Sequence, residues 1–399
     1  MKPSRRWAMP AFLAVALLLT LAPMASAQVQ ETSLVTPVAT FPEAFSNVGG
    51  LLERPDGRVL VADGLGQALM LLDLAAGRAD TIGRTGAGPE EYRQPDGIFP
   101  LPGDSILLVD LGNGRLTAIG PDFGFGETRP IAQGSMGPRG GSMTMRLPRA
   151  TDAEGRVYFQ GRAAMRPGSP LPDSAYMVRW DRATEAVDTL GLVKEQERTM
   201  RSSGGPNNQN INISPVPMSP QDGWSAAGDG RIGVVRSAGY YVEWIQPDGR
   251  VVRGPENEFR SSRVRHADKV AYMNRMQRNA LGMEVTNVNG SMTTSFRRGI
   301  RGGSDEPEVD GLDWPNALPA FQAGGVFVAT NGELWVERYA SAGTAPVYDV
   351  FDDNAVLVRR LTLPEGRTVV GFGNGSVYLA RIDEFDLQWL EKYSLRSEN

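Results

Sequence analysis

The chain has 399 residues, a formal net charge of −5 and no cysteine. A charge this close to neutral argues against the class of nucleic-acid-binding proteins. The lack of cysteine excludes disulfides, thiolate metal sites and a cysteine nucleophile, so a chain of this length has to derive its stability from a large buried core.

The first 27 residues are typical of an export signal. A positively charged start is followed by a largely apolar run over 7–21 and by the small-residue cleavage pattern Ala25-Ser26-Ala27. We expect cleavage before Gln28, a mature domain over 28–399, and a periplasmic or extracellular location without a stable membrane anchor. An uncleaved anchor is the alternative, but the apolar run is shorter than the roughly 20 residues that span a bilayer.

A short apolar strand that follows a tight turn recurs six times along the chain. The six copies are RVLVAD (58–63), SILLVD (105–110), RVYFQG (156–161), RIGVVR (231–236), ELWVER (333–338) and SVYLAR (376–381). Each follows a pair of turn-forming residues that contains glycine, such as Asp56-Gly57. The second and fourth positions are apolar in every copy, and the third is mostly bulky. Such a strand is buried on both faces, as it would be between two packed sheets.

Segments outside the six repeats predict how the repeats are connected and closed. SLVTPVATF (33–41) is β-rich but contains Pro37, which indicates an edge strand. The polar stretch 194–219 is dense in turn formers and predicts a loop. In the largest insertion, 256–312, the apolar spacing of 265–281 predicts one helix, followed by a loop over 297–311.

The last repeat has three strands, and the chain has one spare strand at its other end. A closed ring in which SLVTPVATF completes the last repeat, beside DLQWLEKYSL (386–395), buries every sheet face against a neighbour. An open stack would leave two apolar faces uncovered, and no terminal repeat with a polar outer face is visible. We therefore predict an all-β fold closed into a ring by the N-terminal strand, with one inserted helix.

These repeats resemble those of six-bladed β-propellers of the NHL-like/TolB-like group. Asp110, Asn113 and Arg115 have the D-x-x-N-x-R spacing of NHL repeats, and GRTGAGPEEYRQP (83–95) resembles the linker between such blades. The resemblance extends over about 33–395, although repeats three to six keep the hairpin and lose the D-x-x-N-x-R spacing. It implies a scaffold that binds ligands or proteins and is occasionally hydrolytic.

The sixth position of the repeated strand gives the candidate site residues. In such propellers this position lies at the face that carries the site, and here it holds Asp63, Asp110, Gly161, Arg236, Arg338 and Arg381. If the three guanidiniums face the central channel, they form a receptor for a carboxylate or phosphate. The alternatives are that each side chain caps its own hairpin or pairs with a neighbouring charge, and that the arginine stems cover blade edges.

No catalytic constellation stands out in the sequence. The single histidine, His266, lies on the predicted helix among charged residues, and a lone surface histidine is more often solvated than catalytic. No G-x-S-x-G elbow is present. The glycine-rich segment 83–95 lacks the Lys and Ser/Thr of a P-loop. A cation held by Asp63 and Asp110, as in calcium-dependent six-bladed lactonases, is the enzyme alternative, but arginines on the same ring oppose a cation.

We therefore expect a non-enzymatic exported propeller that binds a ligand or a partner protein through one face, with an anionic group as the preferred target. We expect no cofactor, no resident metal and no nucleic acid. Two other interpretations stay open: a metal-dependent hydrolase or lactonase, and a structural subunit of an assembly.

Overall fold

The computed structural model describes residues 29–134, 143–162, 171–205, 208–288, 291–298 and 307–396. The predicted export signal lies outside these residues. Among the helices that the structure describes, none is long and apolar enough to cross a membrane.

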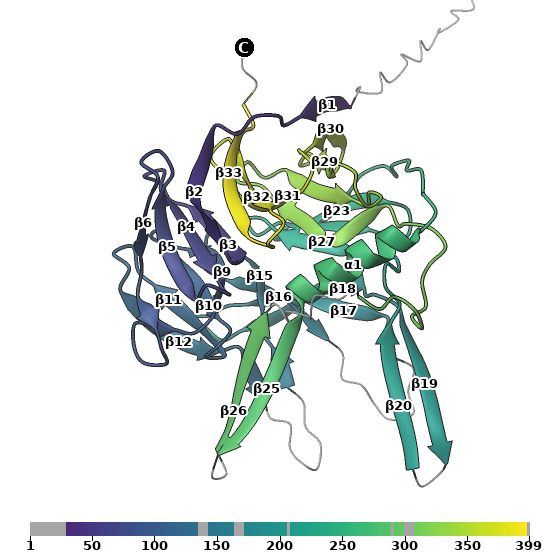
Figure 1. Cartoon of the computed structure of the whole chain (residues 1–399), viewed down its shortest axis with the longest axis horizontal. Coiled ribbons are helices and arrows are strands. Elements are labelled where there is room, and N and C mark those ends of the chain that lie inside the picture. The colour runs from purple at the N-terminus through teal and green to yellow at the C-terminus, as the bar shows by residue number, and fades with distance from the viewer. Residues whose placement is uncertain are drawn as a thin grey trace, which may run out of the picture.

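Six antiparallel sheets form the blades of a β-propeller, as predicted (Figure 1). From blade one to blade six, the strands are β3–β6 (Val48–Glu53, Val59–Asp63, Ala68–Asp73, Arg78–Thr81), β9–β12 (Pro95–Leu101, Ser105–Asp110, Arg115–Ile119, Phe125–Pro130), β15–β18 (Pro148–Thr151, Val157–Arg162, Ser174–Trp180, Val187–Lys194), β21–β24 (Gly223–Ala226, Ile232–Arg236, Tyr241–Ile245, Val251–Arg253), β27–β30 (Phe321–Val328, Leu334–Arg338, Val347–Phe351, Leu357–Thr362) and β31–β33 with β2 (Arg367–Gly373, Ser376–Ile382, Gln388–Ser394, Ala39–Phe45).

The core consists of apolar layers between successive blades. Leu60 and Ala62 of β4 pack toward blade two with Ile106 and Leu108, whereas Val59 and Val61 pack on the other side of the same strand with blade six. The repeated strand is apolar on both faces because each face meets a different neighbouring blade. This confirms the interpretation of the repeated strand.

The N-terminal strand closes the ring. β2 pairs antiparallel with β33, with Ala39 opposite Lys392 and Phe45 opposite Gln388, and Phe41 and Phe45 are buried in the layer between blades six and one. The closing strand begins at Ala39 and not at Ser33, which corrects the predicted boundary. The preceding segment forms β1 (Gln30–Ser33), which pairs parallel with β30 and adds a fifth strand to blade five.

The two faces of the ring differ in their connections. On one, the first strand of each blade passes to the second through short turns, where Gly57 and Gly332 both adopt a φ of +85° that favours glycine; we call this the glycine-turn face. The other, which we call the insertion face, is where the second strand of each blade ends and where the links to the next blade carry the insertions.

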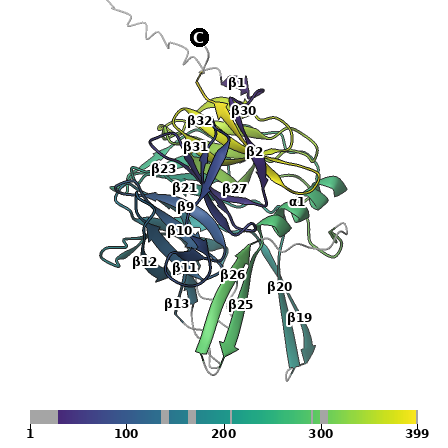
Figure 2. The ribbon, with the colours of Figure 1, turned by 60° about the vertical axis from the view of Figure 1, so that its left-hand side comes forward.

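Two long hairpins project from the propeller on the same side (Figures 1 and 2). β19 (Arg198–Gly205) pairs with β20 (Asn208–Pro215), and β25 (Leu281–Val288) pairs with β26 (Ser291–Arg298). The prediction of a loop over 194–219 is therefore wrong. The alternation Asn-Ile-Asn-Ile-Ser at 210–214 is a strand pattern, and it was outweighed by the many turn-forming residues around it.

The predicted helix is confirmed as α1 (His266–Asn279). The loop predicted over 297–311 is wrong at its start, because residues 297 and 298 belong to β26, while 299–306 lie outside the described residues. Two short pairs, β7 (Arg84–Thr85) with β8 (Glu91–Tyr92) and β13 (Ala132–Gly134) with β14 (Met143–Met145), complete the links between blades.

The second hairpin is anchored on blade two. Phe296 is 2% exposed and packs with Leu111 and Leu116, and its backbone N–H donates to the Leu111 carbonyl at 3.0 Å. Arg298 donates to both oxygens of Asp96, at 2.5 and 2.9 Å. The insertion thus lies outside the ring of blades, as predicted, but is joined to it by apolar and charged contacts.

Candidate functional site

Asp63 and Asp110 both accept hydrogen bonds from backbone N–H groups of their own blade and the link that leads into it. Asp63 accepts from the backbone N–H groups of Ser46, Asn47 and Gly66 at 2.8–2.9 Å. Asp110 is fully buried and accepts from the backbone N–H groups of Arg93 and Gln94 at 3.0 and 3.2 Å. These are the contacts of the capping alternative, and ligand binding by either residue stays a prediction.

The D-x-x-N-x-R residues fasten the glycine-rich linker to blade two. Asn113 donates to the carboxylate of Asp110 at 2.7 Å and to the Gly86 carbonyl at 2.8 Å. Arg115 donates to the same carboxylate at 3.3 Å and to the Glu91 carbonyl at 2.6 Å. Segment 83–95 is therefore held as a link between blades.

The three arginines at the sixth position each contact an acid on the third strand of their own blade. Nε of Arg236 donates to Glu243 at 2.8 Å, Nη1 of Arg338 lies 3.5 Å from Asp349, and Nε of Arg381 lies 3.4 Å from Glu391. In blades four and six, the acid lies two residues beyond the third-strand residue that pairs with the arginine, since Arg236 pairs with Tyr241 and Arg381 with Trp389. Arg236 has a second acid, Asp222, at 3.0 Å.

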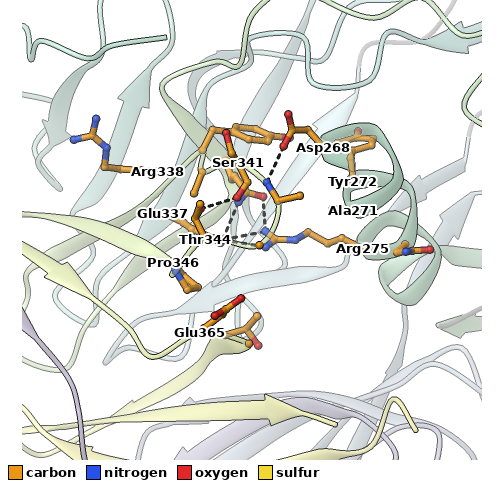
Figure 3. A pocket seen from close by; sticks show the side chains of 18 of the residues that line it. Asp268, Ala271, Tyr272, Arg275, Glu337, Arg338, Ser341, Thr344, Pro346 and Glu365 are labelled. Carbon is orange, nitrogen blue, oxygen red and sulfur yellow. Dashed lines mark hydrogen bonds and ion pairs between the residues drawn. The ribbon is translucent and has the colours of Figure 1, made fainter. Parts of the chain in front are cut away.

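A cavity of about 430 Å³ lies on the insertion face, between α1 and the loops of blades five and six. Figure 3 shows Asp268, Tyr272 and Arg275 of α1 on one side and Glu337, Ser341 and Thr344 on the other. Of the three arginines predicted from the sequence, only Arg338 lines the cavity. The charged lining residues are Asp268, Arg275, Arg278, Glu337, Arg338, Glu365 and Arg367.

Two buried carboxylates at this end of the ring are each shared by two guanidiniums. Asp349 contacts Arg338 at 3.5 Å and Arg360 at 2.9 Å. Glu391, 4% exposed, contacts Arg367 at 3.2 Å and Arg381 at 3.4 Å. Of the four arginines, only Arg360 has a further described acid, Glu31 at 3.1 Å, so each of the other three relies on one shared carboxylate.

Arg278, on the wall of the cavity, has one long contact to a carboxylate. Its nearest described carboxylate, the exposed Asp386, is 3.7 Å away. Burial, together with the charge of neighbouring Arg275, lowers the pKa of Arg278 despite the opposing effect of Asp386. An additional anion beside this guanidinium would offset both its desolvation and the repulsion from Arg275.

α1 is fixed over the cavity by two charged contacts. Arg275 donates to Glu337 through both terminal nitrogens at 3.1 Å. Asp268, 4% exposed, accepts from the Arg265 backbone N–H at 2.8 Å and from the Ala342 backbone N–H at 2.7 Å. Burial would raise the pKa of Asp268, but the hydrogen bonds from Arg265 and Ala342 hold it below its usual value.

Replacing Asp268 should loosen α1 while the ring stays folded. Asp268→Asn removes the charge that accepts these hydrogen bonds, and we expect a loss of about 1–2 kcal/mol with faster trypsin cleavage at Lys269 and Arg275. Because the pKa of Asp268 is lowered in the folded state, its stabilisation is present above the usual value of 3.8 and is lost as the pH falls through the lowered pKa. Asp310→Asn, at an exposed acid of the same insertion, should leave the cleavage rate unchanged; equal rates in both variants would contradict this role.

His266 is the exposed first residue of α1 and lies outside the cavity lining. Within the described residues, no group of three or more His, Asp or Glu side chains is arranged to hold a metal ion. The sequence did not indicate the contribution of α1 to the cavity, because Arg275 and Glu337 are distant in the chain and only the fold brings them together.

No family model and no curated protein matches the chain. Solved structures with a similar arrangement include a member of the DUF4221 family from Bacteroides vulgatus, at 9% identity over 89% of this chain and 95% of that one, with a TM-score of 0.48. Virginiamycin B lyase from Staphylococcus aureus matches at 10% identity over 90% and 99%, with a TM-score of 0.40. A gluconolactonase from Xanthomonas campestris matches at 10% identity over 90% and 94%, with a TM-score of 0.39. At these values the comparisons carry no argument about activity.

Proposed function

We propose that this protein is an exported, non-enzymatic β-propeller of the NHL-like/TolB-like group that binds an anionic group in the cavity beneath α1. The group is a carboxylate or phosphate, either of a small molecule or of a partner protein. The observation that carries the proposal is that two guanidiniums of the cavity lining, those of Arg278 and Arg338, each have a single long contact to a carboxylate. The export signal predicted in residues 1–27 supports the location.

The guanidiniums of the cavity differ in how available they are to a ligand. Arg275 is bound to Glu337 through both terminal nitrogens, so its role is to hold α1. Arg338 and Arg278 have single, long contacts to carboxylates, at 3.5 and 3.7 Å, which leave most of their N–H donors to other acceptors. A ligand that bridges the loops of blade five and α1 would meet both.

The proposal is tested by titrating the protein with inorganic phosphate and with succinate in a calorimeter. The double variant Arg278→Ala/Arg338→Ala should bind either anion about tenfold more weakly or worse, since charge-assisted hydrogen bonds are lost. Its melting temperature should change by only a few degrees, because Asp349 keeps its contacts to Arg360 and Tyr240 and the acid beside Arg278 is exposed. Arg58→Ala, which removes a partly exposed arginine paired with Asp56 on the glycine-turn face, is the matched control.

Two outcomes would refute the proposal. One is equal anion affinity in the double variant and the wild type. The other is a large fall in melting temperature with unchanged binding, which would make these arginines structural bridges.

A further inference from the structure

The other end of the central channel also opens into a cavity. On the glycine-turn face, a cavity of about 550 Å³ is bordered by residues of β9, β15, β21 and β27. An adjoining cavity of about 450 Å³ extends toward blades one and six, and the two share Pro100, Thr330, Asn331 and Phe372. We call the larger cavity the channel mouth. It stands at the opposite end of the ring from α1.

The wall of the channel mouth is aromatic. Phe99, Phe327 and Phe372 come from the first strands of blades two, five and six, and all three line the cavity while being only partly buried. The rings of Phe327 and Phe372 lie 6.3 Å apart between centroids, tilted by 57°. Partly exposed aromatic rings that converge from separate blades offer a surface for an apolar body.

The guanidinium of Arg149, at the channel mouth, has no acidic partner among the described residues. Arg149 of β15 donates to the neutral side-chain oxygen of Gln160 at 3.0 Å and lies 5.0 Å from the centre of the Trp224 ring. Within the described residues no carboxylate lies within ion-pair distance of it. Arg231 in the same lining differs, because Asp229 neutralises it at 2.7 Å.

The hydrogen-bond donors of Arg149 are accessible to an anion. Arg149 is exposed to the channel mouth. Apart from the N–H that Gln160 accepts, its donors are available to a ligand in a cavity large enough for a small molecule.

We infer that the channel mouth is a second binding site, for a small amphipathic carboxylate whose charge is bound by Arg149 and whose apolar or aromatic body packs on Phe99, Phe327 and Phe372. A carboxylate fits better than a phosphate, because a single guanidinium matches one planar, singly charged group and because the aromatic wall would desolvate a dianion without pairing it. This site is independent of the one beneath α1.

The test uses three probes of related shape. Phenylacetate carries both the ring and the charge, phenylacetamide keeps the ring without the charge, and acetate keeps the charge without the ring. Calorimetry on the wild-type protein should show phenylacetate binding at least about tenfold tighter than either of the others. Equal binding of phenylacetate and phenylacetamide would overturn the inference.

Two variants locate the site. Arg149→Gln should lower phenylacetate affinity by about tenfold or more. Asn331→Asp adds a negative charge at the rim while keeping the side-chain oxygen that accepts the Glu333 backbone N–H, and it should also weaken phenylacetate. This second variant decides the matter if Arg149→Gln does not fold. Unchanged affinity in the folded variants would overturn the inference.

The variant Arg278→Ala/Arg338→Ala separates the two sites. It should bind phenylacetate as the wild type does, whatever happens to its binding of phosphate. Loss of phenylacetate binding in this double variant would place the ligand beneath α1 and refute a site at the channel mouth. Retained phenylacetate binding together with unchanged phosphate binding would support the channel mouth and count only against the function proposed for the insertion face.

Discussion

A chain that begins at Ser46 should fail to give a cooperative thermal transition. It lacks β2, the outer strand of blade six, and with it the buried side chains of Phe41 and Phe45, which are 1% and 2% exposed. Removing a buried phenylalanine costs about 3–5 kcal/mol, so the loss of two is comparable with the whole stability of a typical domain, about 5–15 kcal/mol. Differential scanning calorimetry would measure the effect.

A chain that begins at Leu34 is the matched control. It loses β1, a strand with mostly exposed side chains at the outer edge of blade five, and keeps the whole of β2. Its melting temperature should fall by only a few degrees relative to a chain that begins at Gln28. If the two truncated chains melt alike, ring closure by β2 does not stabilise the propeller.

Asp349→Ala should cost about 3–5 kcal/mol, the usual effect of removing one partner of a buried charge pair. Asp349 is fully buried and accepts from the Tyr240 hydroxyl of blade four as well as from Arg338 and Arg360 of blade five. The variant leaves two cations and a buried hydroxyl without their acceptor. Denaturant unfolding would measure the loss.

Asp353→Ala is a suitable control for Asp349→Ala, since Asp353 is exposed in a turn of the same blade and should change stability by less than about 0.5 kcal/mol. The double variant Asp349→Ala/Arg338→Ala should recover part of the loss, because one unpaired cation is then removed with the acid. A single variant Asp349→Ala as stable as the wild type would show that water replaces the buried contacts.

The fold was predictable from sequence because its main signal is local. The turn before each repeated strand and the apolar second, third and fourth positions, such as Val59, Leu60 and Val61, all lie within a few residues of one another. They require burial on both faces, which a ring of blades provides. The hairpin β19–β20 was missed because its strand pattern, around Ile211 and Ile213, is embedded among residues that favour turns.

The candidate site was predictable only in part because partner choice is a property of the assembled ring. The arginines at the sixth position of the repeated strand included Arg338, which lines the cavity. The acids that contact Arg236, Arg338 and Arg381 could be identified in the third strands only once the strand register was known. Arg275 of α1 contacts Glu337 of blade five, and Tyr240 of blade four contacts Asp349 of the neighbouring blade five. Arg149 carried no signal in the sequence, since what distinguishes it is that no acid in the described part of the chain pairs with it.

Closure of the ring by strands from opposite ends of the chain determines the order of events during synthesis. β2 leaves the ribosome among the first residues of the fold, whereas its partner β33 leaves among the last. Until then, Phe41 and Phe45 and the apolar side of blade one have no cover. Contacts between such distant segments make folding slow and leave unfinished chains prone to aggregate. The propeller therefore completes its folding only after β33 has left the ribosome, and a chaperone that covers the N-terminal segment until then would protect it from aggregation.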